Sequence, residues 1–276
     1  MSLKRSHAAR IAQETVEILA AGRYATAAGT AVHIRDLLDA AKRGTVSYPP
    51  DASLPDVVPS GNATAFEVRN ETTLEAARRL VAEGFRPAAL NFASARHPGG
   101  GFLSGARAQE ESLCRASGLY ACLAGSGMYL HHAPMPGGFY SNYAVYSPGV
   151  PVIRTDDGEL LDEPYLCAFV TAPAVNVGAI RPEDGGRVRS EMAERVRKVL
   201  AVAAGHGHDA VVLGAWGCGV FRNDPEVIAD LFREALVTRF AGVFARVAFA
   251  VLDTSADGGT IRPFAERFGG VSGPPA

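Results

Sequence analysis

The sequence predicts an α/β protein in which helices flank a mixed, largely parallel sheet. Residues 64–93 contain an alternating strand, an amphipathic helix and a short apolar strand, which is the order of a parallel crossover unit. Three more apolar segments of strand length, 165–171, 209–213 and 246–252, are separated by amphipathic helical segments. Open α/β sheets bind ligands at the carboxyl ends of their strands. The sequence therefore predicts a binding site at that edge of the sheet.

Two parts of unequal size are expected along the chain. Residues 1–60 are interpreted as a mainly helical accessory segment packed on the core, and residues 61–276 as the main domain. Apolar residues at helical spacing predict an amphipathic helix from Arg5 to Ala21. Residues 32–41 contain a short strand, followed either by its continuation or by a short helix. Four prolines make residues 47–60 an irregular connector.

The main domain carries the elements of the α/β core in order. The predicted strands are 64–69, 88–93, 144–146, 165–171, 209–213 and 246–252. The predicted helices are 73–83, 106–123, 192–204 and 225–239. Residues 125–150 are rich in glycine, proline, tyrosine and methionine, and in this segment only 144–146 is expected to be a strand.

Composition narrows the class of protein. The chain has 276 residues, 47% apolar and 20% charged, which is ordinary for a globular protein with a sizeable core. Its net charge is −2, so no broad basic surface is predicted and specific nucleic-acid binding is not expected. No stretch has the length and apolarity of a signal peptide or a membrane span. The four cysteines occur singly, so we expect a cytoplasmic protein with free thiols. We also expect a monomer with no membrane partner.

The stretch from Asn91 to Ala116, NFASARHPGGGFLSGARAQEESLCRA, concentrates the functional signals. Pro98 ends the preceding strand, because it lacks an N–H group and restricts the residue before it. Three glycines follow at 99–101, and such a run is tolerated where the backbone takes positive φ or another group approaches closely. Free N–H groups in a glycine loop and at a helix start form a concavity suited to phosphate or pyrophosphate.

Two carboxylates, Glu110 and Glu111, fall in the first turns of the helix that follows this loop. One interpretation is that they only complement the helix dipole, as acidic residues in a first turn often do. The glycines a few residues upstream favour a functional interpretation. If one carboxyl is a general acid, its pKa must be raised, whereas a helix N-terminus lowers it. Burial and nearby phosphate charge are then expected to outweigh the dipole.

The two motifs together resemble the signature of the poly(ADP-ribose) glycohydrolases, in which GGG is followed after a short spacer by QEE. Here Gly99, Gly100 and Gly101 are followed after seven residues by Gln109 and the two glutamates. The segment NFAS at 91–94 is similar to a strand end that reads Asp-Phe-Ala-Asn in the larger animal enzymes, so Asn91 and Ser94 differ from that pattern. The segment LCRASGLY at 113–120 resembles the compact bacterial branch of the family.

A second glycine cluster, GAWGCGVFRND at 214–224, resembles the phosphate loop of macrodomains, the ADP-ribose-binding fold to which the glycohydrolases are related. It lacks the Lys-Ser/Thr of an ATP-binding P-loop, and a tight strand-to-helix turn is the alternative interpretation. The resemblance implies a macrodomain-like catalytic domain at 61–276. It also implies that two facing glycine loops clamp a pyrophosphate, with Phe221 covering the distal ribose.

The resemblance implies hydrolysis of the ribose–ribose O-glycosidic bond of poly(ADP-ribose), with ADP-ribose as the product. By match to the motif, Glu111 is the general acid and then the base, and Glu110 orients ribose hydroxyls. Adjacent helical residues point about 100° apart, which favours unequal roles. The candidate substrate-binding residues are Asn91, Ser94, Gly99, Gly100, Gly101, Gln109, Asn176, Gly217, Cys218, Gly219, Val220 and Phe221.

Other functions remain open at this point. One is hydrolysis of another ADP-ribosyl linkage, such as mono-ADP-ribose on a protein or base, and one is non-catalytic ADP-ribose binding, which the QEE motif disfavours. The compact chain and the absence of a basic run favour release of ADP-ribose from the chain end. The pairs His131–His132 and His206–His208 lack a third ligand, so neither a metal nor a cofactor is expected.

Overall fold

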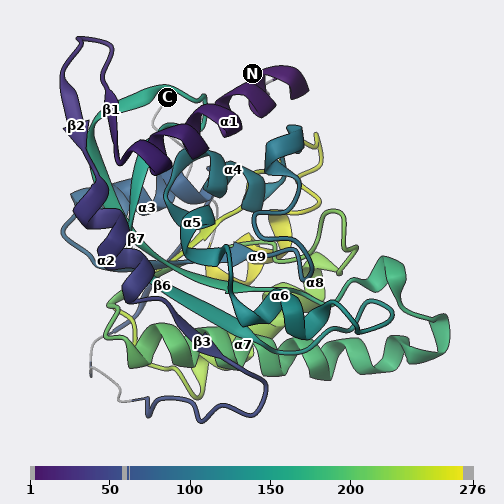
Figure 1. Ribbon diagram of the computed structural model, residues 1–276. Coiled ribbons are helices and arrows are strands. Elements are labelled where there is room, and N and C mark those ends of the chain that lie inside the picture. The colour runs from purple at the N-terminus through teal and green to yellow at the C-terminus, as the bar shows by residue number, and fades with distance from the viewer. Residues whose placement is uncertain (1–3, 58–60, 62, 270–276) are drawn as a thin grey trace.

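The sheet at the centre of the computed structural model has seven strands, and the structure describes residues 4–57, 61 and 63–269 (Figure 1). The strands are β3 (Val46–Tyr48), β4 (Ala65–Arg69), β5 (Pro87–Phe92), β6 (Ala144–Arg154), β7 (Leu160–Ala172), β8 (Ala210–Leu213) and β9 (Arg246–Ala250). Their spatial order is β3-β6-β7-β5-β8-β9-β4. The pairs from β7 to β4 are parallel, whereas β6 pairs antiparallel with β7 and with β3. The predicted mixed, largely parallel sheet is confirmed.

Helices cover both faces of this sheet (Figure 1). One face carries α1 (Arg5–Ala21), α2 (Arg35–Arg43), α3 (Thr73–Ala82), α4 (Gln109–Ala116) and α5 (Leu119–Leu123), and the other carries α7 (Val188–Gly205), α8 (Pro225–Val237) and α9 (Arg262–Phe268). Successive strand residues point to opposite faces. Thus Ala89 and Val212 belong to the core under α3 and α4, whereas Leu90 and Val211 belong to the core over α7 and α8.

The segment before the main domain forms a helix and a hairpin and then enters the sheet. The strands β1 (Arg23–Ala25) and β2 (Ala31–His33) pair antiparallel. The residues after β2, which could have continued the strand or formed a short helix, form the helix α2. The predicted connector at 47–60 is wrong at its start, because Ser47 and Tyr48 pair with β6 at the sheet edge. Its end, 58–60, lies outside the described residues.

One prediction for the middle of the chain is also wrong. The strand expected at 144–146 extends to Arg154, although it contains Pro148 and Pro151. The register shifts between Ser147 and Val150, so Pro148 lies in a bulge, where its missing N–H costs no ladder bond. The short helices α6 (Gly127–His132) and α9 were not predicted.

The helix predicted over 106–123 starts later and is interrupted. It begins at Gln109, and Ser117 takes an extended conformation (φ −146°, ψ 175°) and forms a bridge to Val152 of β6. The chain therefore turns after Ala116 and continues as α5. No helix within the described residues is long and apolar enough to cross a membrane.

Candidate active site

A cavity of about 480 Å³ lies at the carboxyl ends of β5, β7 and β8, the edge at which the sequence predicts a site. Parallel strands bring these ends together, so residues distant in the sequence share one wall. The lining residues are Phe92, Ala93, Ser94, His97, Gly100, Gly101, Ala108, Gln109, Glu110, Glu111, Ala174, Ala215, Trp216, Gly217, Gly219, Val220 and Phe221. We call this space the first cavity.

Gln109 fixes the start of α4 to the end of β5. Its Oε1 accepts the N–H of Phe92 (2.9 Å), and its Nε2 donates to the carbonyl of Leu90 (2.7 Å) and to the hydroxyl of Thr73 (3.1 Å). The N-cap residue Ala108 offers no side-chain bond, so this amide anchors the helix end instead. Gln109 was predicted to bind substrate; in the structure its side chain is engaged by the protein and sets the position of the next two residues.

Glu110 lines the first cavity but is largely buried, with 3% of its surface exposed. Its Oε2 accepts the N–H of Ser94 at 2.6 Å, and its Oε1 lies 3.5 Å from Nδ2 of Asn91. Burial raises the pKa of Glu110 to about 8, and the charge of Glu111 adds to the shift, although the Ser94 N–H opposes it. For this carboxyl, burial outweighs the helix N-terminus, as a protonated role requires.

Glu111 lines the same cavity from the next position of the helix. Its Oε1 accepts the N–H of Gly101 at 3.0 Å, and its Oε2 is buried with no partner among the described residues. Gly100 has a φ of +58°, and a Cβ at this position would collide with Oε1 of Glu111 and lie 3.1 Å from Oε2 of Glu110. Glycine is required here because both carboxylates approach the backbone.

The first loop, Gly99–Gly101, therefore differs from the predicted phosphate cradle. The N–H of Gly100 donates to the carbonyl of His97 (2.9 Å) and that of Gly101 to Glu111. Gly99 has positive φ, and a Cβ there would lie 3.2 Å from Sγ of Cys114. The prediction that these amides are free for an anion is wrong for Gly100 and Gly101, because the loop uses them to hold its own turn and a carboxylate.

The second loop, Gly217–Phe221, faces the first cavity from β8. Within residues 4–57, 61 and 63–269, the N–H groups of Gly219, Val220 and Phe221 have no acceptor. A Cβ added to Gly219 would meet nothing within 4 Å, whereas one at Gly217 would lie 2.6 Å from Ala174. Val220 is 81% exposed. This loop offers unpaired amides and open space, the properties of an anion site.

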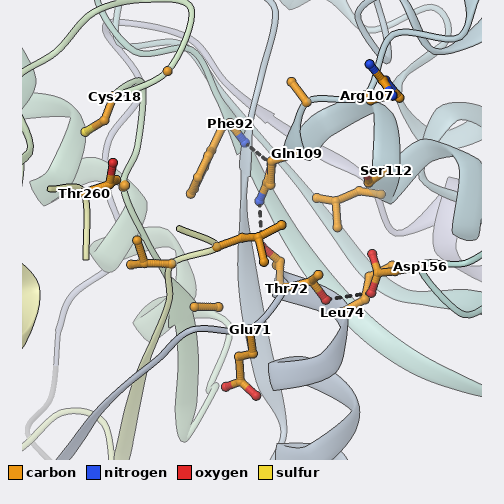
Figure 2. Close-up of a pocket in the computed structure, with 18 residues that line it drawn as sticks. Glu71, Thr72, Leu74, Phe92, Arg107, Gln109, Ser112, Asp156, Cys218 and Thr260 are labelled. Carbon is orange, nitrogen blue, oxygen red and sulfur yellow. Dashed lines mark hydrogen bonds between the residues drawn. The ribbon is translucent and has the colours of Figure 1, made fainter. Parts of the chain in front are cut away.

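A second cavity, of about 340 Å³, adjoins the first and shares Phe92, Gln109 and Gly219 with it. Figure 2 shows Cys218 and Thr260 on one side of it and Asp156 on the other. The hydroxyl of Thr72 donates to Oδ2 of Asp156 (2.6 Å), which ties α3 to the turn between β6 and β7. Burial raises the pKa of Asp156. The two cavities form one cleft across the ends of β5 and β8.

Some of the remaining predicted site residues line one of the two cavities, and the others lie outside both. Ser94 lines the first cavity, and its hydroxyl accepts the N–H of His97 (3.2 Å). Cys218 lines the second cavity. Asn91 is fully buried and lines neither cavity; it bonds Thr171 (3.2 Å). Asn176 also lies outside both walls, and its N–H donates to the carbonyl of Gly138.

Several wall residues were not predicted. His97, Ala174, Thr72 and Asp156 lie in loops and turns that meet only in the folded chain. His97 is separated from the first loop only by Pro98, and this nearness is the one sequence signal that pointed to it. Trp216 is fully buried and also borders the first cavity. Among the described residues, no group of three or more His, Cys, Asp or Glu side chains is arranged to hold a metal ion.

This geometry agrees with the comparisons to known proteins. Residues 12–155 match the family described as microbial-type PARG, catalytic domain. The chain is similar to the poly(ADP-ribose) glycohydrolase (PARG) of Thermomonospora curvata, with 49% identity and a TM-score of 0.89 over 96% of this chain and 100% of that chain. A structure of that species' enzyme bound to the inhibitor ADP-HPD gives 48% identity and a TM-score of 0.89 over the same shares of the chains, 96% and 100%.

A more distant solved structure is PARG from Deinococcus radiodurans in complex with ADP-ribose. It has 44% identity and a TM-score of 0.80 over 84% of this chain and 97% of that chain. No curated protein matches the chain. The resemblance inferred from the GGG and QEE motifs is confirmed, and the chain belongs to the microbial-type poly(ADP-ribose) glycohydrolase family.

Proposed function

We propose that this protein hydrolyses the ribose–ribose O-glycosidic bond of poly(ADP-ribose) and releases ADP-ribose. One observation carries the proposal: Glu110 and Glu111 are held by backbone amides in one cavity, opposite a loop in which the N–H groups of residues 219–221 have no acceptor among the described residues. Such a site provides a carboxyl for proton transfer and N–H groups for a pyrophosphate. The related enzymes named above include one solved with ADP-ribose and one with ADP-HPD, which supports the same ligand class.

The two joined cavities match the two halves of ADP-ribose. The pyrophosphate would receive N–H groups from Gly219, Val220 and Phe221, at the junction of the cavities. The distal ribose would then occupy the first cavity beside the glutamates, and the adenosine half the second. Phe221 lines the first cavity and is half-buried, so its ring is available to cover the distal ribose.

Glu111 is proposed as the acid and then the base. Its carboxylic acid gives a proton to the leaving 2′-oxygen as the bond from C1″ to that oxygen breaks, which leaves an oxocarbenium-like ribose. A water then adds to C1″ and returns a proton to the carboxylate. The products are ADP-ribose and a chain one unit shorter. Oε2 of Glu111 suits this role because Oε1 is already held by Gly101.

Glu110 is proposed to orient the distal ribose without adding charge. Because its pKa is raised to about 8, it is mostly protonated at neutral pH and can donate as well as accept hydrogen bonds. A charge on Glu110 would repel the pyrophosphate, and also the carboxylate that Glu111 becomes once it has given up its proton. Asn91 and Gln109 act behind the pair, by holding Glu110 and the start of α4.

We also propose that ADP-ribose leaves from the chain end. Val220, which is 81% exposed, and Phe221 both line the first cavity, and their apolar side chains are proposed to close one end of the cleft. Early products from long polymer test this point: free ADP-ribose with slowly shortening chains supports it, and mid-length oligomers refute it.

The main experiment compares wild type, Glu111→Gln and the exposed control Glu163→Gln on labelled polymer and on mono-ADP-ribosylated protein. We expect Glu111→Gln to lower polymer hydrolysis about 10²–10⁴-fold, because the amide keeps the shape but cannot deliver a proton. ADP-ribose affinity, measured by calorimetry, should be nearly unchanged. Activity of Glu111→Gln close to wild type would refute its role. If wild type hydrolysed the mono-ADP-ribosylated protein but not the polymer, its substrate would be the other ADP-ribosyl linkage.

A further inference from the structure

A cationic and aromatic rim borders the first cavity on the side of Phe221. It consists of Arg96, Tyr140 and Arg222. The guanidinium of Arg96 lies over the Tyr140 ring at 5.9 Å from its centroid, and the Tyr140 and Phe221 rings are 6.4 Å apart. Arg96 directly precedes His97, and Arg222 directly follows Phe221, both of which line the cavity. The rim is therefore continuous with the proposed site of the distal ribose.

The backbone at this rim is unusual. Within the described residues, Tyr140 (φ +54°) and Arg222 (φ +59°) are the only non-glycine residues with positive φ, and both lie beside Phe221. Side chains other than Asn and Asp rarely take this conformation, because it costs about 1–3 kcal/mol. Such strain persists where the surroundings fix it, and it concentrates at sites that bind ligands.

The two arginines offer charge that the protein does not neutralise. Neither Arg96 nor Arg222 has a carboxylate partner among residues 4–57, 61 and 63–269, and both are exposed. Arg96 is nonetheless held in place, since it donates to the carbonyl of Met135 at 2.8 Å. Its guanidinium is thus held at a fixed place over the Tyr140 ring. Fixed Arg planes and aromatic rings stack with nucleic-acid bases.

We infer that this rim is a leaving-side subsite, which binds the adenosine diphosphate unit of the polymer that remains after cleavage. The inference rests on the proposed function. The scissile bond joins the distal ribose in the first cavity to the 2′-oxygen of an adenosine, so an adenine necessarily lies near the mouth. That adenine stacks on the Arg96–Tyr140 pair, and the phosphates that follow it lie against Arg222.

The test measures steady-state hydrolysis of long polymer and, separately, affinity for ADP-ribose, which lacks the leaving unit. The variants are Arg96→Gln, Tyr140→Asn and Arg222→Asn, because asparagine tolerates positive φ. Tyr140→Phe keeps the ring. The matched controls are Arg233→Gln, an exposed arginine on α8, and Leu130→Asn, at a site 78% exposed on α6.

We expect Arg96→Gln and Tyr140→Asn each to raise the KM for polymer about five- to a hundred-fold, the range of one base stack. ADP-ribose affinity should be retained in both, and Tyr140→Phe and the controls should behave as wild type. For Arg222→Asn, the loss of polymer affinity relative to wild type should become larger as the salt concentration is lowered. Because Arg96 and Tyr140 form one platform, their double variant should lose little more than either alone.

The failures are distinguishable. If wild type releases no ADP-ribose from polymer, the proposed function fails. If wild type is active and the Arg96 and Tyr140 variants keep its KM for polymer, the leaving-side subsite is refuted while the function stands. A parallel loss of ADP-ribose affinity in these variants also refutes it, because the rim would then support the product pocket.

Discussion

The two loops that face each other across the first cavity both depend on glycine, but for opposite reasons. In the first loop, Gly99–Gly101, glycine is needed because protein atoms come too close for a side chain, and those at Gly100 belong to the two glutamates. In the second, Gly219 has open space around its missing Cβ, and its N–H has no acceptor among the described residues. The first loop therefore positions the reacting groups, and the second receives the ligand.

This difference changes what a glycine motif indicates. A run of three glycines before a helix is usually interpreted as a phosphate cradle, because its N–H groups are assumed to be free. Here Gly100 and Gly101 use theirs within the protein. In the less regular cluster, the N–H groups of residues 219–221 have no acceptor within the part of the chain that the structure describes. Predictions can therefore separate loss of chemistry from loss of affinity.

Among the changes that compare the two loops, the largest effect is expected from Gly100→Ala. The methyl group would collide with the Glu111 carboxylate, and alanine at φ +58° is strained by about 1–2 kcal/mol. We expect single-turnover hydrolysis to fall about 10²-fold, the cost typical of a misplaced catalytic group, with a much smaller change in ADP-ribose affinity. Gly29→Ala is the matched control, because Gly29 has a φ of +81° and nothing within 4 Å. Equal activity of the two variants would show that Glu111 does not depend on this glycine.

An intermediate effect is expected from pH at Glu110. Its pKa of about 8 in the folded protein lies above the ordinary value of 4.5, so folding favours the protonated form. That contribution to stability is fully present below pH 4.5 and is lost as pH rises through about 8. Glu110→Gln has no such charge, so its melting temperature relative to wild type should increase from pH 5 to pH 9. A difference between the two that does not vary with pH would contradict the raised pKa.

The same group should limit activity in alkali. As Glu110 ionises near pH 8, it adds charge beside Glu111 and the pyrophosphate, so kcat/KM of wild type should fall above that pH. The residual activity of Glu110→Gln should not show this decrease above pH 8. If kcat/KM fell with the same midpoint pH in both proteins, the decrease would belong to the ionisation of another group.

The smallest effect is expected from Gly219→Ala in the second loop. The methyl group meets no protein atom, so the free energy of unfolding should be unchanged. It would enter the space proposed for the pyrophosphate, and we expect ADP-ribose affinity to fall about ten-fold, a typical cost of crowding a close-fitting site. Gly185→Ala, also with nothing within 4 Å, serves as the control. An unchanged affinity would mean that the ligand does not approach Gly219.

Much of this arrangement could be predicted from the sequence. Strand and helix periodicity predicted the crossover from β4 to β5, and the spacing of GGG and QEE predicted that Glu110 and Glu111 follow a glycine loop. These features are local, because each depends on residues that are close together in the sequence. The long hairpin of β6 and β7 was missed because Pro148 and Pro151 usually end a strand, and a bulge accommodates the first of them.

The partners of the polar groups could not be predicted, since they come from distant segments. Gln109 was expected to face substrate, but the end of β5 and Thr73 of α3 engage its amide. Glu110 was interpreted either as a complement to the helix dipole or as a site carboxylate, and its burial, which raises its pKa to about 8, depends on segments distant from it in the sequence. The rim formed by Arg96 and Tyr140 joins positions 44 residues apart and left no pattern in the sequence.

The division of labour between the loops is tested most directly by backbone amide NMR with ADP, which carries the pyrophosphate but no distal ribose. If the account is right, ADP shifts the amide protons of Gly219, Val220 and Phe221 downfield, because these N–H groups gain phosphate acceptors. The Gly101 amide should stay in place, since it remains bonded to Glu111. Large shifts at Gly100 and Gly101 with none at 219–221 would contradict it.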